Sequence, residues 1–325
     1  MKIYAVLTLI LCVIMVFFPL ISMALKNELF DESLPAQEII SDKNDKNSIS
    51  DTNNTISVLR VSSDKVIDVD IYDYIIGTVA AEMPITFDAE ALKAQAVACY
   101  SYALWIQSNG DNAKNELYDI SDSSESHQAY LDDEQLREKW GEKYEKNIKI
   151  IKDAVNSVLG EYLVYDNQPA MCVYHAISCG RTQSAKLAWG NDIPYLHGTV
   201  APGDTLSPDF ENEVTLTSKE VAEKLSLKQT DDNIKIETES NESGYVSSVS
   251  VGNDTFTGTQ FAAKIGLNSP CFTVTQKNDS FTFNVKGKGH GIGMSQYSAD
   301  YMARQGNTYK EILAHFYEGT DLTKS

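Results

Sequence analysis

One glutamate, at the junction of two apolar segments, is well placed for acid–base chemistry. Glu82 lies in the run TVAAEMPITFD, just before Pro84, which cannot continue a helix and therefore places the glutamate at a helix end. A carboxyl group among apolar neighbours has a raised pKa, which a general acid working at neutral pH requires. The competing interpretation is a solvated helix-end glutamate, because a perturbed carboxyl marks a functional site only statistically.

Two further stretches place histidine beside cysteine or glycine. Residues 174–182 read YHAISCGRT. Cys172, His175 and Cys179 resemble metal ligands in spacing, but in an extended strand residue 172 points away from the face of 175 and 179. Residues 287–299 read GKGHGIGMSQYSA, in which four alternate glycines permit a close backbone approach. A phosphate cradle is disfavoured there because the Lys-Ser/Thr pair of a P-loop is absent.

The apolar spacing predicts the elements that position these residues. One helix should end near Glu82 and a second should begin after Asp88, preceded by short strands from residue 56. The predicted fold class is α+β: a helical catalytic core packed on small antiparallel sheets, with a strand-rich second lobe at about 205–286. The remaining predicted elements are a helix over 131–159 that ends at Gly160, strands over 162–165 and 170–177, hairpins over 234–251 and 273–286, and helices with capping boxes at Thr217 and Thr308.

Composition limits the classes of function. The 325 residues are 42% hydrophobic, which is ample for a sizeable core, and the net charge is -19. This acidity argues against nucleic acid as a partner, because phosphate binding needs a basic face. Of five cysteines, Cys12 lies in the amino-terminal segment. The other four permit disulfides, but spacing does not assign them.

The amino terminus predicts an attachment to the membrane. Residues 3–25 are almost continuously apolar, which suffices to span a bilayer, although residues 22–24 (Ser-Met-Ala) would also suit signal-peptide cleavage. We favour an uncleaved single-pass anchor, with the body outside the cytoplasm. The predicted domains are the anchor (or signal peptide) at 1–26, a flexible acidic linker at 27–56, and the body at 57–325.

Three blocks, in order, resemble one known family. VAAEMP followed by LKAQAVA, then YHAISCGRT, then GKGHGIGMSQYSA are similar to the motifs of the stage II sporulation protein D (amidase-enhancer) family. The resemblance covers residues 57–325. It implies that Glu82 is the catalytic acid of a peptidoglycan lytic transglycosylase, which cleaves the bond from N-acetylmuramic acid to N-acetylglucosamine and leaves 1,6-anhydromuramyl ends. A single catalytic carboxylate fits this reaction, since ordinary glycosidases need two.

The resemblance also implies biology and partners. The family acts in sporulation, where it thins the septal wall during engulfment, together with a cell-wall amidase and a membrane scaffold (stage II sporulation proteins P and M). A different class of function is a non-catalytic glycan-binding enhancer of the amidase. A third is a structural wall-binding protein.

Residues of the three blocks are candidates for holding the glycan. Four cations, Lys93, Arg181, Lys186 and Arg304, could line a groove for the lactyl carboxylates or could be ordinary surface charges. His175 could equally be a hydrogen-bonded histidine at a strand end. The predicted substrate-binding residues are Lys93, Gln95, His175, Ser178, Arg181, Thr182, His290 and Gln296.

The chain departs from the family pattern at two places. Many relatives hold zinc with a cysteine and a histidine, but here Ser121 or Asp122 stands where the cysteine would be, and only His127 remains. A lone histidine is no metal site, so we expect neither metal nor cofactor and interpret His127 with Gln128 as polar loop or groove residues. Tyr100 stands where the family usually has arginine.

Overall fold

The computed structural model describes residues 55–109, 117–227 and 234–325. Contacts divide the chain into Met1–Thr52 and Asn53–Ser325, and every described residue belongs to the second unit. The predicted anchor and nearly all of the predicted linker lie outside the described residues. No helix within the described ranges is long and apolar enough to cross a membrane.

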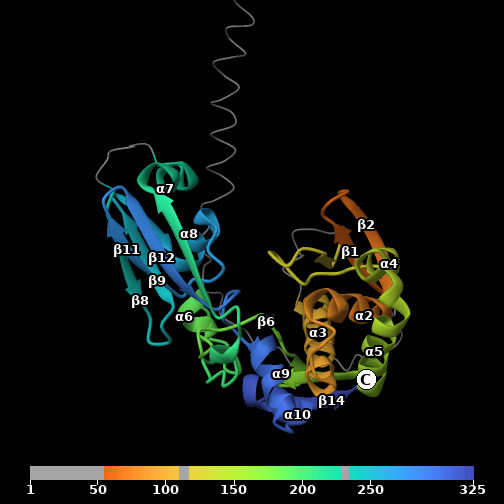
Figure 1. Ribbon diagram of the computed structural model, residues 1–325. Coiled ribbons are helices and arrows are strands. Elements are labelled where there is room, and N and C mark those ends of the chain that lie inside the picture. Colours follow the sequence, from red (N-terminus) through yellow and green to blue (C-terminus); the bar gives the residue numbers. More distant parts are fainter. Residues whose placement is uncertain (1–54, 110–116, 228–233) are drawn as a thin grey trace, which may run out of the picture. The chain divides into compact units, whose positions relative to one another are not determined.

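Helices and several small sheets alternate along the chain, so the predicted mixed α+β composition is confirmed (Figure 1). The elements outside the strand-rich lobe are β1 (Thr55–Arg60), β2 (Lys65–Asp70), α2 (Ile71–Glu82), α3 (Ala89–Asn109), β3 (Ile120–Ser121), α4 (Asp133–Trp140), the 3-10 turn η2 (Gly141–Lys143), α5 (Tyr144–Ser157), β4 (Glu161–Tyr165), β5 (Gln168–Pro169), β6 (Tyr174–His175), α6 (Ala185–Trp189), η3 (Asp204–Leu206), β13 (Met294–Ser295), α9 (Gln296–Arg304), α10 (Tyr309–Phe316) and β14 (Asp321–Lys324).

Helix α3 lies at the centre of the larger hydrophobic core. It contacts α2, α5, α9, α10 and β4 (Figure 1). Its sequence is rich in alanine, which has the highest helix propensity and lets neighbouring helices approach closely. Asp88 caps it as predicted, since its carboxylate accepts the Glu90 N–H at 2.9 Å. The buried alanines of α3 therefore bring elements distant in sequence to one core.

The sheets are short, and most of their strand pairs are antiparallel. Two pairs are parallel, contrary to the antiparallel prediction: β1 with β3, and β6 with β13. In the second pair Met294 lies opposite Tyr174, and Ser295 lies opposite His175. This small parallel bridge joins the central motif to the glycine-rich motif.

Residues 211–286 form the strand-rich lobe, which has a hydrophobic cluster of its own. Phe261, Phe272 and Phe283 pack ring against ring at its centre. Tyr245 is one of the lobe residues that contact the rest of the chain: its hydroxyl donates to the Arg181 carbonyl at 3.2 Å. Its elements are β7 (Glu211–Thr217), α7 (Ser218–Leu225), β8 (Ile236–Ser240), β9 (Val246–Val251), β10 (Asp254–Thr257), α8 (Gly258–Ile265), β11 (Phe272–Lys277) and β12 (Ser280–Lys286).

Two predicted elements are wrong in extent. The single helix over 131–159 is two helices, because the chain breaks at Gly141, where φ is +51°. The strand over 170–177 is reduced to Tyr174–His175. Residues 170–173 instead run through the core as irregular backbone, with Ala170 and Cys172 fully buried.

Candidate functional site

Glu82 is the last residue of α2, as the sequence predicts. Met83 caps the helix in an extended conformation (φ -109°, ψ 141°), and its N–H returns to the Val79 carbonyl at 3.0 Å. Pro84 fixes this stop because it restricts the residue before it to extended backbone. The Glu82 side chain is half-buried, between buried Ala80 and Met83. The carboxyl group is thus held at a rigid helix end and partly screened from water.

The Glu82 carboxyl has three polar neighbours from different elements. The Ala129 N–H donates to Oε1 at 2.7 Å, the Gln296 side chain also donates a hydrogen bond, and Lys139 adds a positive charge. Burial raises the pKa of Glu82, and these three neighbours oppose it without cancelling it. The raised pKa that the sequence predicts is therefore confirmed.

A chain of buried polar groups continues from Glu82 into the core. Gln296 Nε2 donates to Gln95 Oε1 at 3.3 Å, and Gln95 Nε2 lies 3.2 Å from Cys99 Sγ. Cys99 Sγ in turn lies 3.6 Å from the Tyr174 hydroxyl. Of the predicted substrate-binding residues, Gln95 and Gln296 are thus the two that this network brings together with Glu82. Burial raises the pKa of Cys99 to about 12, so its thiol stays neutral.

Asp204, which the sequence analysis missed, joins the central and glycine-rich motifs. Its side chain is fully buried. It accepts the Ser178 N–H at 2.6 Å, the Ser295 hydroxyl at 2.6 Å and the Ser298 hydroxyl at 2.8 Å. Burial raises its pKa, against these donors. Asp204 follows a Pro-Gly turn in a long loop, where no periodic pattern marks it.

His175 and His290 lie together, with ring centroids 5.6 Å apart. His175 Nδ1 lies 3.0 Å from the Ile292 carbonyl, whereas its buried Nε2 has no hydrogen-bond partner. The Ile292 N–H donates to His290 Nδ1 at 3.1 Å. Burial lowers the pKa of His175 to about 4; burial and then the neighbouring His175 lower that of His290 to about 3. Both rings are neutral at pH 7.

The other predicted binding residues have local partners. Lys93 pairs with Glu90 at 2.6 Å, and Arg181 donates to the Gly198 carbonyl at 2.9 Å. Ser178 and Thr182 are buried; the Ser178 hydroxyl accepts the Gly180 N–H, and the Thr182 hydroxyl accepts the Thr199 N–H at 2.8 Å. The partners of these four side chains are thus all supplied by the protein.

The residues at the family's zinc position do not fit zinc. His127 Nδ1 lies 2.9 Å from the Ser121 hydroxyl, so Ser121 takes the place facing the histidine. A neutral hydroxyl is not among the usual ligands of protein-bound zinc. Among the described residues, no three histidine, cysteine or acidic side chains group together as a metal site.

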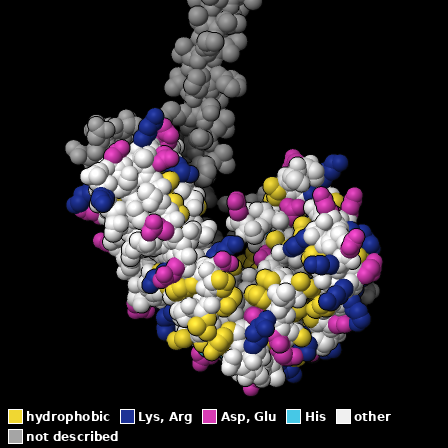
Figure 2. Space-filling model, in the orientation of Figure 1, with side chains coloured by type: hydrophobic (Ala, Val, Ile, Leu, Met, Phe, Trp, Pro, Cys, Tyr) yellow, Lys and Arg dark blue, Asp and Glu magenta, His cyan; other side chains and the backbone are white. Residues whose placement is uncertain are grey.

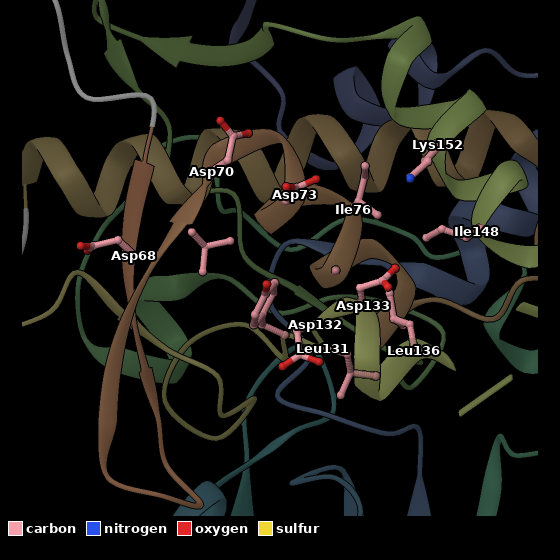
Figure 3. Close-up of a pocket in the computed structure, with 13 residues that line it drawn as sticks. Asp68, Asp70, Asp73, Ile76, Leu131, Asp132, Asp133, Leu136, Ile148 and Lys152 are labelled. Carbon is pink, nitrogen blue, oxygen red and sulfur yellow. The ribbon is translucent and has the colours of Figure 1, made fainter. Parts of the chain in front are cut away.

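A cavity of about 470 Å³ lies on another face of α2 (Figure 3). Asp73, Ile76 and Gly77 of α2 line it. Asp73 and Glu82 are nine residues apart, which places them on opposite sides of the helix, about 180° around its axis. Figure 3 shows Asp68, Asp70, Asp132 and Asp133 around the same cavity. This acidic cavity is separate from the Glu82 network.

The surface carries no continuous basic strip on the face that Figure 2 shows, where Asp and Glu side chains are interspersed with Lys and Arg. Three of the four cations proposed for a groove are paired with carboxylates: Lys93 with Glu90, Lys186 with Asp192 and Arg304 with Asp300. The charge available for an anionic glycan is therefore largely neutralised locally.

Comparison with known proteins identifies the family. The SpoIID family, described as stage II sporulation protein, matches residues 60–165, which include Glu82. Stage II sporulation protein D of Bacillus subtilis (strain 168) is 34% identical over 272 residues, which cover 83% of this chain and 79% of that protein. This chain belongs to the SpoIID family. The resemblance inferred from the three motif blocks is confirmed.

Two further relatives differ in how closely they match this chain. Stage II sporulation protein D of Bacillus amyloliquefaciens is 32% identical over 272 residues, with 83% of this chain and 79% of that protein covered. The amidase enhancer of Bacillus subtilis (strain 168) is 25% identical over 305 residues, which cover 76% of this chain but 40% of that protein. The chain is thus similar to the sporulation proteins over most of their length and to the amidase enhancer over less than half of its length.

Proposed function

We propose that this SpoIID-family protein is a peptidoglycan lytic transglycosylase, with Glu82 as its acid–base residue. The observation that carries the proposal is the environment of Glu82: a half-buried carboxyl group with a raised pKa, positioned by one backbone N–H and one amide. Such a group is protonated over a wider pH range than an exposed glutamate and can donate its proton to a leaving oxygen.

The hydrogen bonds favour one assignment of the proton. Oε1 accepts the Ala129 N–H, so the proton of the neutral acid is best placed on Oε2. Glu82 would protonate the glycosidic oxygen as the bond to N-acetylmuramic acid breaks. It would then accept the proton of the muramyl 6-hydroxyl as that hydroxyl closes the 1,6-anhydro ring. Because nucleophile and leaving group belong to one substrate, the step is effectively unimolecular.

Within the part of the chain that the structure describes, no second carboxyl group shifts the pKa of Glu82, which favours internal attack over hydrolysis. Inverting and retaining glycosidases place two carboxyl groups about 5–9.5 Å apart. Among the described residues, Lys139 is the charged side chain that shifts the pKa of Glu82, and no other carboxyl group does so. Asp204 is a fully buried carboxyl group with a raised pKa, and its two oxygens already accept hydrogen bonds from the protein.

The biological setting is part of the proposal. The most similar relatives described above are named stage II sporulation protein D, which supports a role in sporulation. We assign the protein to the thinning of septal peptidoglycan, as a single-pass membrane protein with its body outside the cytoplasm. Its proposed partners are the glycan strands, a cell-wall amidase and a membrane scaffold, stage II sporulation proteins P and M.

The second candidate is a glycan-binding enhancer of an amidase, which the match to an amidase enhancer favours. Both candidates require glycan binding, and they differ in whether the chain itself breaks the strand. Under the enhancer hypothesis, Glu82→Gln would stimulate the amidase as fully as the unaltered chain does.

Mass spectrometry of glycan strands tests the proposal directly. Purified strands, stripped of stem peptides, are incubated with the full-length protein, with Glu82→Gln, and with Glu138→Gln, a control at an exposed glutamate of α4. We expect 1,6-anhydromuramyl ends from the unaltered chain and from the control, but not from Glu82→Gln. Reducing muramyl ends would show that water attacks. Strand binding without cleavage would favour the enhancer.

A further inference from the structure

Two cysteines from distant parts of the chain face the same turn of the strand-rich lobe. Cys179 lies in the central motif, and Cys271 immediately precedes β11. Cys179 Sγ lies 3.4 Å from the Ser243 carbonyl oxygen, and Cys271 Sγ lies 3.2 Å from the carbonyl oxygen of the next residue, Gly244. Each of the two thiols also shifts the pKa of the other, so the two sulfurs lie close together. Both are free thiols in the structure.

The two thiols differ in exposure and acidity. Cys179 is partly exposed, whereas Cys271 is 8% exposed. The neighbouring Cys271 thiol lowers the pKa of Cys179, against the effect of burial. The neighbouring Cys179 thiol and burial raise the pKa of Cys271. A partly exposed sulfur with a lowered pKa, beside a second thiol, is the arrangement of an attacking cysteine with a resolving partner.

We propose that Cys179 and Cys271 form a redox-active pair that a disulfide-containing oxidant converts to an intrachain disulfide. Cys179 thiolate attacks one sulfur of the oxidant, forms a mixed disulfide and releases one thiolate. Cys271 then loses its proton and attacks Cys179 Sγ, which releases the second thiolate. Two cysteine thiols thereby lose two protons and two electrons, and the oxidant is reduced to two thiols.

The disulfide would fasten the central motif to the strand-rich lobe. Cys179 lies between two residues of the central motif that are already held in place. The N–H of Ser178, just before it, donates to Asp204, and the carbonyl of Arg181, two residues after it, accepts the Tyr245 hydroxyl. Reduced, this junction is held by hydrogen bonds; oxidised, it gains a covalent bond that closes a long loop of chain. Protein disulfides persist outside the cytosol, where we predict the body to lie. The proposal does not depend on Glu82 or on lytic activity.

The remaining buried cysteines supply an internal control. Cys99 and Cys172 are fully buried, and burial raises the pKa of Cys99 to about 12 and that of Cys172 further. An oxidant that reaches Cys179 should therefore leave Cys99 and Cys172 reduced.

Peptide mapping after controlled oxidation tests the pair. The full-length protein is equilibrated with mixtures of oxidised and reduced glutathione, quenched with acid, alkylated and digested. We expect a cross-linked Cys179–Cys271 peptide that dithiothreitol abolishes, and free Cys99 and Cys172. Oxidation should also move the urea midpoint to a higher concentration in the unaltered chain.

Single substitutions separate the two steps. We expect Cys271→Ser to stop at a mixed disulfide with glutathione on Cys179, and Cys179→Ser to lose both the cross-link and the redox dependence of the urea midpoint. Cys99→Ala, at a cysteine outside the pair, should keep the cross-link. The proposal is overturned if the unaltered chain accumulates only the mixed disulfide on Cys179, if both thiols stay reduced at every glutathione ratio, or if Cys99 or Cys172 enters the cross-link.

Discussion

At the scale of single residues, burial raises the pKa of Glu82, and the hydrogen bonds and the charge around it only partly offset this effect. A carboxyl group that was fully paired would ionise readily, and one that faced water would keep its ordinary pKa. The Ala129 N–H and the Gln296 amide orient Glu82, yet burial still dominates. The raised pKa suits a general acid, but it also means that the ionised form of Glu82 destabilises the folded chain.

We expect Glu82→Gln to be more stable than the unaltered chain at neutral pH. The folded pKa of Glu82 lies above its unfolded value, so the unaltered chain loses stability as pH rises from the unfolded value through the folded one. Glutamine keeps an acceptor for the Ala129 N–H and cannot ionise. Urea denaturation at pH 4 and pH 8 measures the difference, which should grow with pH. An equal effect at both values would mean that ionisation is not its cause.

We expect Lys139 to influence the pH at which the proposed lytic activity falls on the alkaline side. Its charge lowers the pKa of Glu82, and its amine donates to the Ala80 carbonyl at 3.0 Å. In Lys139→Met the pKa of Glu82 rises, so the protonated acid persists and the descending limb of kcat/KM moves to higher pH. Lys139→Arg, which keeps the charge, is the control. Because Lys139 is exposed, high salt should reduce the difference. If the descending part of the pH profile did not move in Lys139→Met, Lys139 would not influence the pKa of the catalytic acid.

At the scale of elements, the site is assembled by contacts between short segments. The two-residue bridge between β6 and β13 is too short to be stable alone, and Asp204 reinforces it from η3. The glycine-rich stretch is also held by contacts with a distant segment, because its backbone passes close to residues 173–178, in and next to the central motif.

Asp204→Ala should destabilise the chain by about 3 kcal/mol, because it leaves buried hydrogen-bond donors of Ser178, Ser295 and Ser298 without their acceptor. Asp204→Asn should cost less, since the amide oxygen can still accept the Ser178 N–H and the serine hydroxyls can rotate to accept. The midpoint and slope of urea denaturation give the two values. An alanine variant as stable as the asparagine variant would contradict this role.

Gly293→Ala should destabilise far more than Gly306→Ala. Both glycines have positive φ, +70° and +94°, which costs a residue with a Cβ about 1–2 kcal/mol. A Cβ at Gly293 would also lie 2.0 Å from the Val173 carbonyl oxygen, whereas one at Gly306 meets nothing within 4 Å. Because both variants carry the cost of positive φ, the difference between their thermal unfolding temperatures measures the cost of the steric clash at Gly293. Equal losses would show that backbone strain alone decides.

The elements that the sequence predicts correctly are those with local causes. The capping boxes at Thr217 and Thr308 are present, as are both hairpins of the lobe, because a few neighbouring residues specify each. The strand over 170–177 fails because its pairing partner, β13, lies far along the chain and is two residues long. Glu82 is found from sequence by its motif, but Ala129 and Lys139 are not, since a backbone N–H and an exposed lysine leave no pattern.

At the scale of the whole molecule, charge is the dominant property. The chain has a net charge of -19, and the lactyl carboxylates of stripped glycan strands carry the same sign. The two anions therefore repel at a distance, so the proposed recognition of glycan at the site would depend on short-range hydrogen bonds and on locally paired cations.

We expect binding of stripped glycan strands to be unchanged or stronger when ionic strength rises from 0.01 to 0.15 M, because the Debye length falls from about 30 to about 8 Å and the long-range repulsion is screened. Equilibrium binding of fluorescent strands at several salt concentrations measures this. A neutral glycan such as a chitin oligomer should show no salt dependence. Binding that weakens steadily with salt would instead indicate a basic groove.

The hydrogen bond from Gln296 to Gln95 spans 201 residues of sequence, and Gln296 also orients Glu82. During synthesis the ribosome therefore delivers the acid long before its last positioning partner. A nascent or prematurely terminated chain carries Glu82 without α9, and without β13 it has no parallel strand to seat the central motif. The order of translation thus keeps the proposed wall-cutting site incomplete until nearly the whole chain has emerged.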